Sequence, residues 1–245
     1  MNNPDLFLIK KILKEQESKV YRDFVELENL QNSGSVIKFA TMTLDRLKRS
    51  FYDFFTEKRS DYSVIVKEGR SNIKNNAKKS VYINCIIGIR NFMHSIPYFA
   101  TLVAIKEKNK YIAAIVNNYA TQEIFIVEAG AGAFSNIRKI RVSSRNDLSN
   151  VMIGVKCSKD TGRNVNLLSG LNIAFKINNC YILDICQTAA GKLDGGIILD
   201  ANKEELEIGE LFITESGGLF EFLNQEKTDC IFSNSLIHDS LKKHV

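Results

Sequence analysis

Residues 83–100 read INCIIGIRNFMHSIPYFA and carry the clearest structural pattern in the chain. The apolar run YINCII (82–87) predicts a strand, and a second run, FATLVAI (99–105), predicts another. Between the two runs, Gly88, Asn91 and Pro97 are residue types typical of turns and close packing. The stretch therefore predicts two strands joined by a short, packed connection.

Outward from this stretch, helical and strand patterns follow one another in mixed order. Toward the N-terminus, apolar periodicity predicts helices at 5–31 and about 38–57, followed by a strand at 63–66. Toward the C-terminus we expect a strand–turn–strand at 111–134, a strand at 139–144, an irregular stretch from about 145 to 180, a helix running into a strand at 181–199, a helix at 205–218, and a final strand and helix. This order indicates a layered α/β protein with an N-terminal α+β subdomain (1–145) and a C-terminal α/β subdomain (146–245).

Composition excludes several classes of protein. The 245 residues include 33 Lys and Arg against 28 Asp and Glu, so 33 − 28 gives a net charge of +5. With 44% hydrophobic and 25% charged residues, the chain is neither disordered, collagenous nor a disulfide mini-protein. The charge excess is small and dispersed, and Trp is absent, so we find no direct nucleic-acid signature.

The sequence also predicts where the protein works. No stretch reaches the roughly 20 apolar residues of a membrane helix, and the start of the chain reads as a helix rather than a secretion signal. The five cysteines are odd in number and form no CxxC pair, which favours free thiols. We therefore expect a cytoplasmic protein with no membrane partner.

Three segments in order carry a family resemblance. They are INCIIGIRNFMHSIPYFA (83–100), VEAGAGAFSNIRKIRVSSRNDLSNVMIG (127–154), and LDICQTAAGKLDGG (183–196) continuing to ITESGG (213–218). They resemble the DP-[IL]-DGT-x-NF-x-H-x-x-P-x-F-A motif, the glycine-rich hairpin, and the LDLAYVAAGRLDG and EAGG stretches of the inositol monophosphatase family. The resemblance implies that family's αβαβα layered sandwich, also found in sugar phosphatases, together with a homodimer and magnesium-dependent hydrolysis of a phosphate monoester.

The same motifs differ from the family at the positions that carry chemistry. At the family's metal-ligand positions, Lys67 and Glu68 replace a Glu-Glu pair, Asn84 and Ile87 replace two aspartates, and Glu205 replaces an aspartate. At the phosphate-contacting threonine the chain has Ile89, and at the water-activating Thr and Asp it has Lys38 and Thr41. A Gly-Ser pair that touches substrate corresponds to Asn179 and Cys180. Only Glu205, and the backbone carbonyl of Ile86, remain as equivalents of the family's metal ligands. We therefore expect no metal site and no bound cofactor.

The physical reason is the preference of Mg²⁺ for oxygen ligands that include at least one or two carboxylates. Asn84 offers only a neutral amide, and Lys67 places an ammonium where a carboxylate is needed. At about 4 Å and an effective dielectric of about 20, one pair of unit charges is worth about 4 kcal/mol, and a divalent ion doubles it. Lys67 with Arg90 could instead hold an anionic ligand, because an ammonium is an adequate phosphate binder; alternatively, Lys67 points to solvent or pairs with Glu68 or Glu205.

Other candidate residues have simpler interpretations. His94 could suggest acid–base chemistry, but its equivalent in the family is structural and no nucleophile has a recognisable partner. Asp184 and Asp194 are interpreted as framework hydrogen-bonding residues. Gly130 and Gly132 look like a phosphate loop, yet no GK[ST] follows and a hairpin turn explains them.

Three functions follow from these observations. The first is a non-catalytic inositol-monophosphatase-like protein, a pseudophosphatase, that binds a macromolecular partner or an anionic, phosphate-bearing metabolite. Resemblance to the bacterial extragenic-suppressor (SuhB-like) branch implies a partner in transcription. The second is a residual Mg-dependent phosphatase of inositol 1-phosphate or another sugar monophosphate, with ligands such as Asp200 and Glu205. The third is a decaying gene product.

Overall fold

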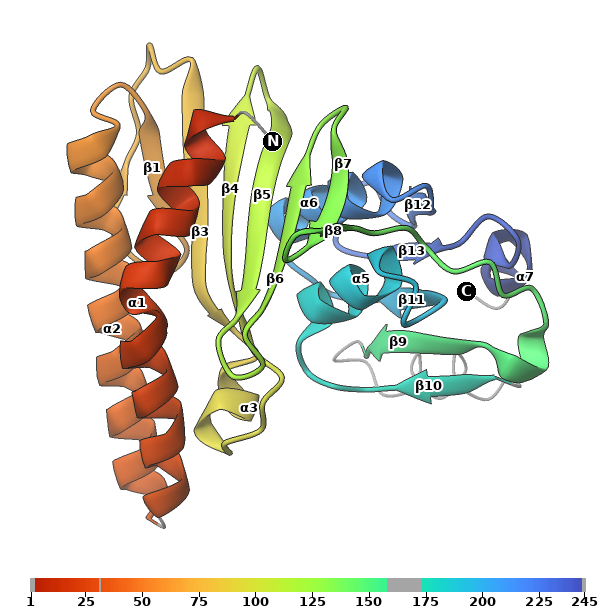
Figure 1. Ribbon diagram of the computed structural model, residues 1–245, viewed down its shortest axis with the longest axis horizontal. Coiled ribbons are helices and arrows are strands. Elements are labelled where there is room, and N and C mark those ends of the chain that lie inside the picture. The colour runs from red at the N-terminus through yellow and green to blue at the C-terminus, as the bar shows by residue number, and fades with distance from the viewer. Residues whose placement is uncertain (1–2, 31, 158–172, 244–245) are drawn as a thin grey trace. The chain divides into compact units, whose positions relative to one another are not determined.

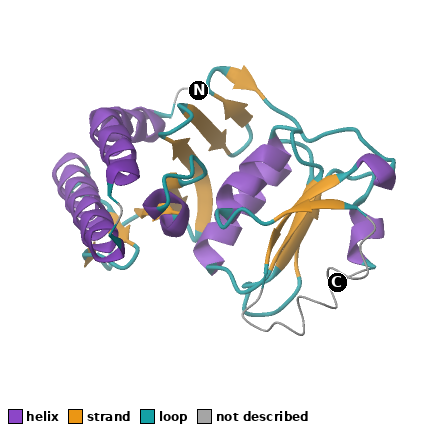
Figure 2. Cartoon of the chain, turned by 90° about the horizontal axis from the view of Figure 1, so that it is seen from below, coloured by secondary structure: helices purple, strands orange, loops and turns teal. Residues whose placement is uncertain are grey.

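A computed structural model of the chain describes residues 3–30, 32–157 and 173–243. The chain divides into two units, Met1–Glu128 and Ala129–Val245. Each unit combines a sheet with helices (Figures 1 and 2), so the expected α/β class is confirmed. The expected subdomain boundary at 145/146 lies further along the chain than this division. None of the helices within the described ranges has the length and apolarity to span a bilayer.

The first unit is a mostly antiparallel sheet with two long helices. Its elements are α1 (Pro4–Asn29), α2 (Ser33–Lys58), β1 (Ser63–Val66), β2 (Ser71–Asn72), β3 (Lys79–Ile87), α3 (Ile89–Met93), β4 (Ala100–Glu107), β5 (Lys110–Asn118) and β6 (Glu123–Glu128). The strands lie in the order β2-β1-β3-β4-β5-β6. β1 is parallel to β3, whereas β3 to β6 are antiparallel neighbours.

Helices α1 and α2 pack on the sheet and on each other (Figure 1), with α1 against β5 and α2 against β1 and β3. The two expected helices are thus confirmed, and α2 begins earlier than expected because the Asn32 side chain caps it, accepting hydrogen bonds from the amides of Gly34 and Ser35. Asp5, 2% exposed, anchors α1: its carboxylate accepts hydrogen bonds from Arg59, Lys79 and Tyr62. Burial, followed by the Asp5 carboxylate, raises the pKa of Tyr62.

The second unit is built on a sheet of order β10-β9-β11-β13-β12. Its elements are β7 (Gly132–Ser135), β8 (Arg138–Lys139), a 3₁₀ turn (Leu148–Asn150), β9 (Met152–Lys156), β10 (Ala174–Lys176), α5 (Tyr181–Ala189), β11 (Gly195–Ile198), α6 (Lys203–Glu215), β12 (Leu219–Phe222), β13 (Cys230–Ser233) and α7 (His238–Lys242). Helix α5 approaches one face so closely that a Cβ on Gly154 would lie 2.6 Å from the Cβ of Asp184. On the other face Leu241 of α7 joins an apolar cluster with Ile153 and Ile197.

Two expectations about this unit were wrong. The strand expected at 139–144 ends at Lys139, because the chain leaves the β7–β8 ladder and the Val142 amide donates to Ser216 O (3.1 Å). The stretch expected to be irregular (145–180) contains β9 and β10, although residues 158–172 lie outside the described ranges. β9 is a short, buried strand between two parallel neighbours, so it lacks the alternation that reveals an exposed strand.

Candidate functional site

The first part of the candidate site lies at the carboxyl ends of β1 and β3. The two strands are parallel with Val66 opposite Ile83, and the Lys67 amide donates to Ile83 O (2.8 Å). Lys67 and Asn84 each follow one of these paired residues, and both are half-buried. The structure therefore brings Lys67 and Asn84 to one edge of this sheet, where the resemblance places metal-ligand carboxylates.

A β-bulge follows at once in β3. Its pairing with β4 shifts register between Asn84 and Ile87, and the Thr101 hydroxyl donates to Cys85 O within the bulge. A bulge of this kind re-aims side chains and is common beside active sites. Here it separates an amide, Asn84, from the buried apolar side chain of Ile87, which is 6% exposed; Ile86 is 7% exposed.

Helix α3 continues from the same strand end. Gly88 has φ +85°, a left-handed conformation that favours glycine, and α3 begins directly after it. Ile89 is half-buried, while Arg90 is exposed in the first turn. Arg90 therefore leaves the backbone a few residues beyond Asn84 and near the same end of β3.

The other residues of this unit that the resemblance places in a site, Lys38, Thr41 and Glu68, are exposed. Lys38 and Thr41 lie within α2, and the Thr41 hydroxyl donates to Ile37 O (2.8 Å) of its own helix. Glu68 lies in the turn after β1 with φ +53°, and its backbone carbonyl accepts a hydrogen bond from Lys48 Nζ (2.9 Å). These contacts are local ones within a helix and between the helix and the turn.

The NF-x-H-x-x-P segment forms packing contacts. The Asn91 side chain, 5% exposed, donates to Tyr98 O (2.7 Å), and the Phe92 and Phe99 rings lie 5.0 Å apart. His94 follows α3 and is exposed. Burial raises the pKa of the nearby Cys85 thiol to about 12, so this cysteine is not a ready thiolate nucleophile. The described contacts of the NF-x-H-x-x-P segment are therefore packing contacts that hold the backbone in place.

In the second unit, Glu205 is fully buried near the start of α6. Its carboxylate accepts a hydrogen bond from the Tyr181 hydroxyl of α5, and its amide donates to the Asn202 side chain (3.1 Å). Asp200 is exposed, and its amide donates to the Asp229 carboxylate (2.9 Å). The carboxylate that stands at a metal-ligand position by the resemblance thus has an internal partner, Tyr181, that the sequence did not reveal.

Asp184 and Asp194 have the framework roles expected of them. Asp194, 1% exposed, accepts hydrogen bonds from the Ser143 hydroxyl (2.6 Å), Arg145 Nε (2.6 Å) and the Met152 amide (2.9 Å). Asp184, also 1% exposed, accepts one from the Asn178 side chain (3.2 Å). These contacts confirm their interpretation as structural residues.

Asn179 and Cys180 lie just before α5. Asn179 is exposed with φ +55°, a conformation that asparagine tolerates better than most residues. Cys180 is fully buried in the N-cap position of α5. The asparagine therefore suits a backbone position where the resemblance places a glycine, whereas the buried thiol gives Cys180 a packing role.

The glycine loop at 130–132 is closed by a residue that sequence reasoning missed. The amides of Gly130 and Gly132 donate to the two carboxylate oxygens of Glu215 at 2.7 and 2.9 Å. Glu215 stands immediately before Ser216-Gly217-Gly218 in the third recognised segment, and this position was the available signal. The loop amides thus hold the chain's own carboxylate.

No group of three or more His, Cys, Asp or Glu side chains within the described ranges is arranged to hold a metal ion. In the first unit, the positions implied by the resemblance hold an ammonium at Lys67, an amide at Asn84 and an alkyl group at Ile87. In the second unit, the corresponding position holds the buried carboxylate of Glu205. The three side chains of the first unit do not suit Mg²⁺, which prefers oxygen ligands that include carboxylates.

Comparisons with known proteins agree with the resemblance. An inositol-1-monophosphatase from Rhizobium meliloti is 29% identical over 206 residues, covering 80% of this chain and 77% of that protein. The Nus factor SuhB of Buchnera aphidicola is 26% identical, covering 82% of this chain and 79% of its own length. Both phosphatases and SuhB proteins are therefore relatives.

Among solved structures, the extragenic suppressor protein suhB from Bartonella henselae shares the fold, with a TM-score of 0.87 at 21% identity over 99% of this chain and 98% of that one. The model of the inositol monophosphatase family matches residues 16–244. By fold and by sequence, this chain belongs to the inositol monophosphatase family.

Proposed function

We propose that this chain is a non-catalytic member of its family, a pseudophosphatase that binds a partner rather than hydrolysing a phosphate ester. The observation that carries the proposal is the strand edge where Lys67 and Asn84 meet, followed by Ile87 across the bulge. A cation, an amide and an alkyl group stand there in place of three carboxylates. Because metal-generated hydroxide would be the nucleophile in such a site, loss of the ligands removes the reaction as well as the metal.

The burial of Glu205 supports the same proposal. A carboxylate that is 0% exposed and hydrogen-bonded to Tyr181 has a structural reason to persist without a metal. Retention of this acid is therefore compatible with loss of catalysis. The relatives named SuhB, described as Nus factors, favour a protein of the transcription machinery as the partner. We further propose that the protein acts in the cytoplasm as a homodimer.

The first test compares the wild-type protein with a rebuilt variant, Lys67→Glu/Asn84→Asp/Ile87→Asp. We expect no phosphate release from inositol or sugar monophosphates by the wild type at any Mg²⁺ concentration up to tens of millimolar. The rebuilt variant should gain Mg²⁺ binding, measured by titration calorimetry. Lys74→Glu, which repeats the charge change of Lys67→Glu at another lysine of this unit, is the control for that substitution and should gain none.

One outcome would overturn the proposal. Magnesium-dependent phosphate release by the wild type, abolished by Glu205→Ala, would establish the alternative function, a residual phosphatase of inositol 1-phosphate or another sugar monophosphate. The presence of phosphatases among the relatives makes this the necessary comparison. An active family member assayed in parallel verifies the substrates.

The partner is tested separately. Affinity purification of the tagged full chain should recover transcription proteins, and their absence would argue against a partner of that class. The anionic-metabolite version of the proposal places the ligand near Lys67 and Arg90. It is tested by titrating inositol 1-phosphate into the wild type and Arg90→Gln, with loss of binding expected in the variant.

A further inference from the structure

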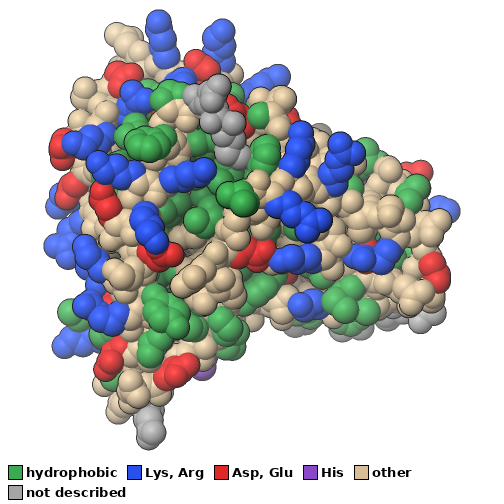
Figure 3. All heavy atoms as spheres, viewed as in Figure 1, with side chains coloured by type: hydrophobic (Ala, Val, Ile, Leu, Met, Phe, Trp, Pro, Cys, Tyr) green, Lys and Arg blue, Asp and Glu red, His purple; other side chains and the backbone are tan. Residues whose placement is uncertain are grey.

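One stretch of the second unit is basic without any acidic residue. Residues 129–146 include four basic residues, and the rest of the chain has 29 basic and 28 acidic residues. The four are Arg138, Lys139, Arg141 and Arg145, and all of them are exposed. Figure 3 shows Lys and Arg side chains gathered over β7, β8 and the segment that follows β8. The charge excess, expected to be dispersed, is therefore uneven, because the chain without this stretch is almost neutral.

A tight hairpin presents an apolar side chain beside these cations. Strands β7 and β8 pair as far as Ser135 and Arg138, so Asn136 and Ile137 alone form the connection. Asn136 has φ +54°, a conformation that asparagine tolerates better than most residues. Ile137 is 99% exposed. Because a two-residue connection between paired strands has a defined geometry, the isoleucine is positioned before any partner binds.

Acidic side chains close to this stretch already have partners within the chain. The Glu215 carboxylate accepts hydrogen bonds from two amides of the glycine loop. Asp194 is 1% exposed and accepts one from Arg145 Nε (2.6 Å). By contrast, the described residues supply no ion pair to the guanidinium group of Arg138 or Arg141. These two groups are available to carboxylates from outside the chain.

The tertiary structure brings a further cation to the same place. Arg145 Nη2 donates to Gly191 O (2.8 Å), and a Cβ on Gly191 would lie 3.0 Å from Arg141 O. The next residue, Lys192, is exposed. The turn after α5 therefore lies against the segment after β8. We define the basic surface by Ile137, Arg138, Lys139, Arg141, Arg145 and Lys192.

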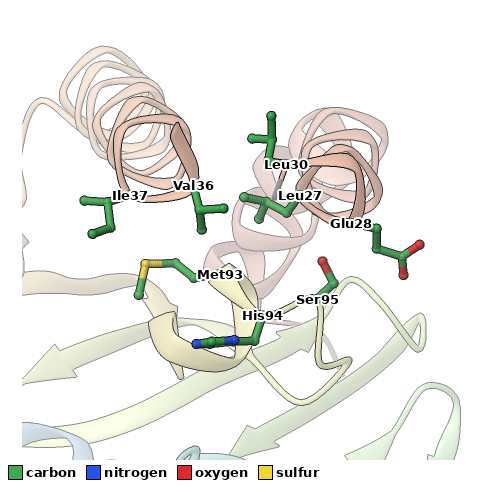
Figure 4. A pocket seen from close by; sticks show the side chains of 8 residues that line it. All are labelled: Leu27, Glu28, Leu30, Val36, Ile37, Met93, His94 and Ser95. Atoms are coloured by element: carbon green, nitrogen blue, oxygen red, sulfur yellow. The ribbon is translucent and has the colours of Figure 1, made fainter. Parts of the chain in front are cut away.

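Two features of the first unit lack this combination. The basic stretch at 67–79 contains Glu68, and its Lys74 and Lys79 ammonium groups are bonded to Ser60 O and the Asp5 carboxylate. The pocket in Figure 4, of about 610 Å³, is lined by the end of α1 and the start of α2. These helix ends carry partial charges of opposite sign, so they do not select a ligand of either charge.

The side chains of the basic surface favour a protein over a nucleic acid. Arginine is enriched in protein interfaces, and its guanidinium group can bind a carboxylate through two parallel hydrogen bonds. Proteins that bind single-stranded nucleic acid commonly stack the bases on exposed aromatic rings. Phe134 is the only aromatic residue of 129–146, and it is half-buried with the Lys139 ammonium 6.0 Å from its ring centroid. Ile137 offers an apolar contact instead of a stacking platform.

We propose that the basic surface binds an acidic segment of a protein partner. The guanidinium groups of Arg138 and Arg141 bind its carboxylates, and Ile137 packs against an apolar side chain between them. This inference rests on the proposed function, because it names the kind of partner that the non-catalytic protein binds. Charge complementarity of this kind promotes association and selects among partners, and salt weakens it.

The experiment compares three fluorescein-labelled probes by anisotropy during titration with the full chain. The first is a peptide that repeats Glu-Leu-Glu-Gly, the second repeats Glu-Ser-Glu-Gly, and the third is a uridine oligonucleotide with the same number of negative charges. The Glu-Leu peptide should bind, and more weakly at higher ionic strength. The Glu-Ser peptide and the oligonucleotide should each bind several-fold more weakly than the Glu-Leu peptide.

Variants locate the interaction. Arg138→Gln and Arg141→Gln should each weaken binding of the Glu-Leu peptide by about two- to five-fold, the range for one exposed ion pair. Arg70→Gln removes an exposed arginine of the first unit and is the matched control, with no change expected. Ile137→Ser should weaken binding of the Glu-Leu peptide and leave that of the Glu-Ser peptide unchanged. Circular dichroism confirms that each variant folds.

Three results would overturn the inference. Absence of peptide binding even at low ionic strength would show that the basic surface takes no acidic segment. Equal weakening by Arg70→Gln and Arg141→Gln would show a general effect of net charge. Tighter binding of the oligonucleotide, with the same dependence on Arg138 and Arg141, would make the occupant a nucleic acid. Failure of the proposed function has a different signature, magnesium-dependent phosphate release by the wild type, which leaves peptide binding intact.

Discussion

The strand ends of the first unit and the interior of the second unit differ in their carboxylates. At the strand ends of the first unit, where the family resemblance places acids, the side chains are Lys67, Asn84 and Ile87. In the second unit, Asp194 and Glu205 are buried and hydrogen-bonded by the chain's own donors. In the second unit these buried acids serve the fold itself. On the proposed function, the acids replaced at the strand ends of the first unit are ones that would serve only a metal.

The strongest test of this comparison removes a buried acid. Asp194→Ala deprives Ser143, Arg145 and the Met152 amide of their acceptor. We expect a loss of about 3 kcal/mol in the free energy of unfolding, since breaking a buried, hydrogen-bonded charge leaves its partners unpaired. Urea unfolding at pH 7 measures this loss.

Asp147→Ala serves as its control. Asp147 is exposed and accepts hydrogen bonds from Ser149 and Asn150 close in sequence. Its loss should cost much less stability than the loss of Asp194, because its hydrogen bonds are exposed to solvent. If both variants lost the same stability, the buried network around Asp194 would not be the anchor that its geometry indicates.

An intermediate effect is expected at Glu205. This acid is buried and hydrogen-bonded, and it also stands where the resemblance places a metal ligand. In a double-mutant cycle of Tyr181→Phe and Glu205→Gln, we expect each single variant to lose about 1–2 kcal/mol, with a coupling of about 1 kcal/mol. The reason is the hydrogen bond that the two side chains form in a buried position. Unfolding is measured with and without Mg²⁺.

The neighbouring Glu204→Gln is the matched control for this cycle, and it should alter stability little. Stabilisation of the wild type by Mg²⁺ that disappears in Glu205→Gln would count against a purely structural Glu205. It would restore this residue to the metal-ligand set.

The smallest effect concerns pH. Burial lowers the pKa of His238 below its usual 6.5, although Glu221 and Asp239 act in the opposite direction and Lys242 adds to the lowering. The unfolded chain therefore binds this proton more readily than the folded one, so stability falls as pH drops below about 6.5 and is unaffected above it. Urea unfolding between pH 7.5 and 5.5 should show this slope, reduced in His238→Gln.

His94→Gln, at an exposed histidine, is the control for the replacement of a histidine. The buried imidazole of His238 lies 2.9 Å from the Ser233 hydroxyl and 3.9 Å from the Glu221 carboxylate. Stability that rises as the pH falls, and only when His238 is present, would show that the interaction with Glu221 outweighs burial.

Local patterns predicted most of the elements. The apolar run at 63–66 is strand β1, and the periodicity at 38–57 falls inside α2, because burial on one face imposes these periods. Strands β9 and β12 were missed because Gly154 interrupts the apolar run of the first and Glu221 that of the second. Motifs were enough to locate the positions equivalent to the family's site. For example, they pointed to Lys67 and Asn84, which lie together at the ends of β1 and β3.

The partners of the site residues could not be predicted. Gly130 and Glu215 are 85 residues apart, and Ser143 and Asp194 are 51 apart, so their hydrogen bonds depend on tertiary structure. The bulge between Asn84 and Ile87 is likewise invisible in an apolar run, because it depends on the register with β4. Spacing along the chain identifies candidates, whereas their contacts require the fold.

The bulge in β3 also bears on how this lineage can change. One hydrogen bond within it joins the neighbouring strands through the backbone carbonyl of Cys85 and the Thr101 hydroxyl. This bond does not depend on which side chains stand at positions 84 and 87. One contact that shapes the strand is therefore inherited independently of the residues that set the chemistry at its end.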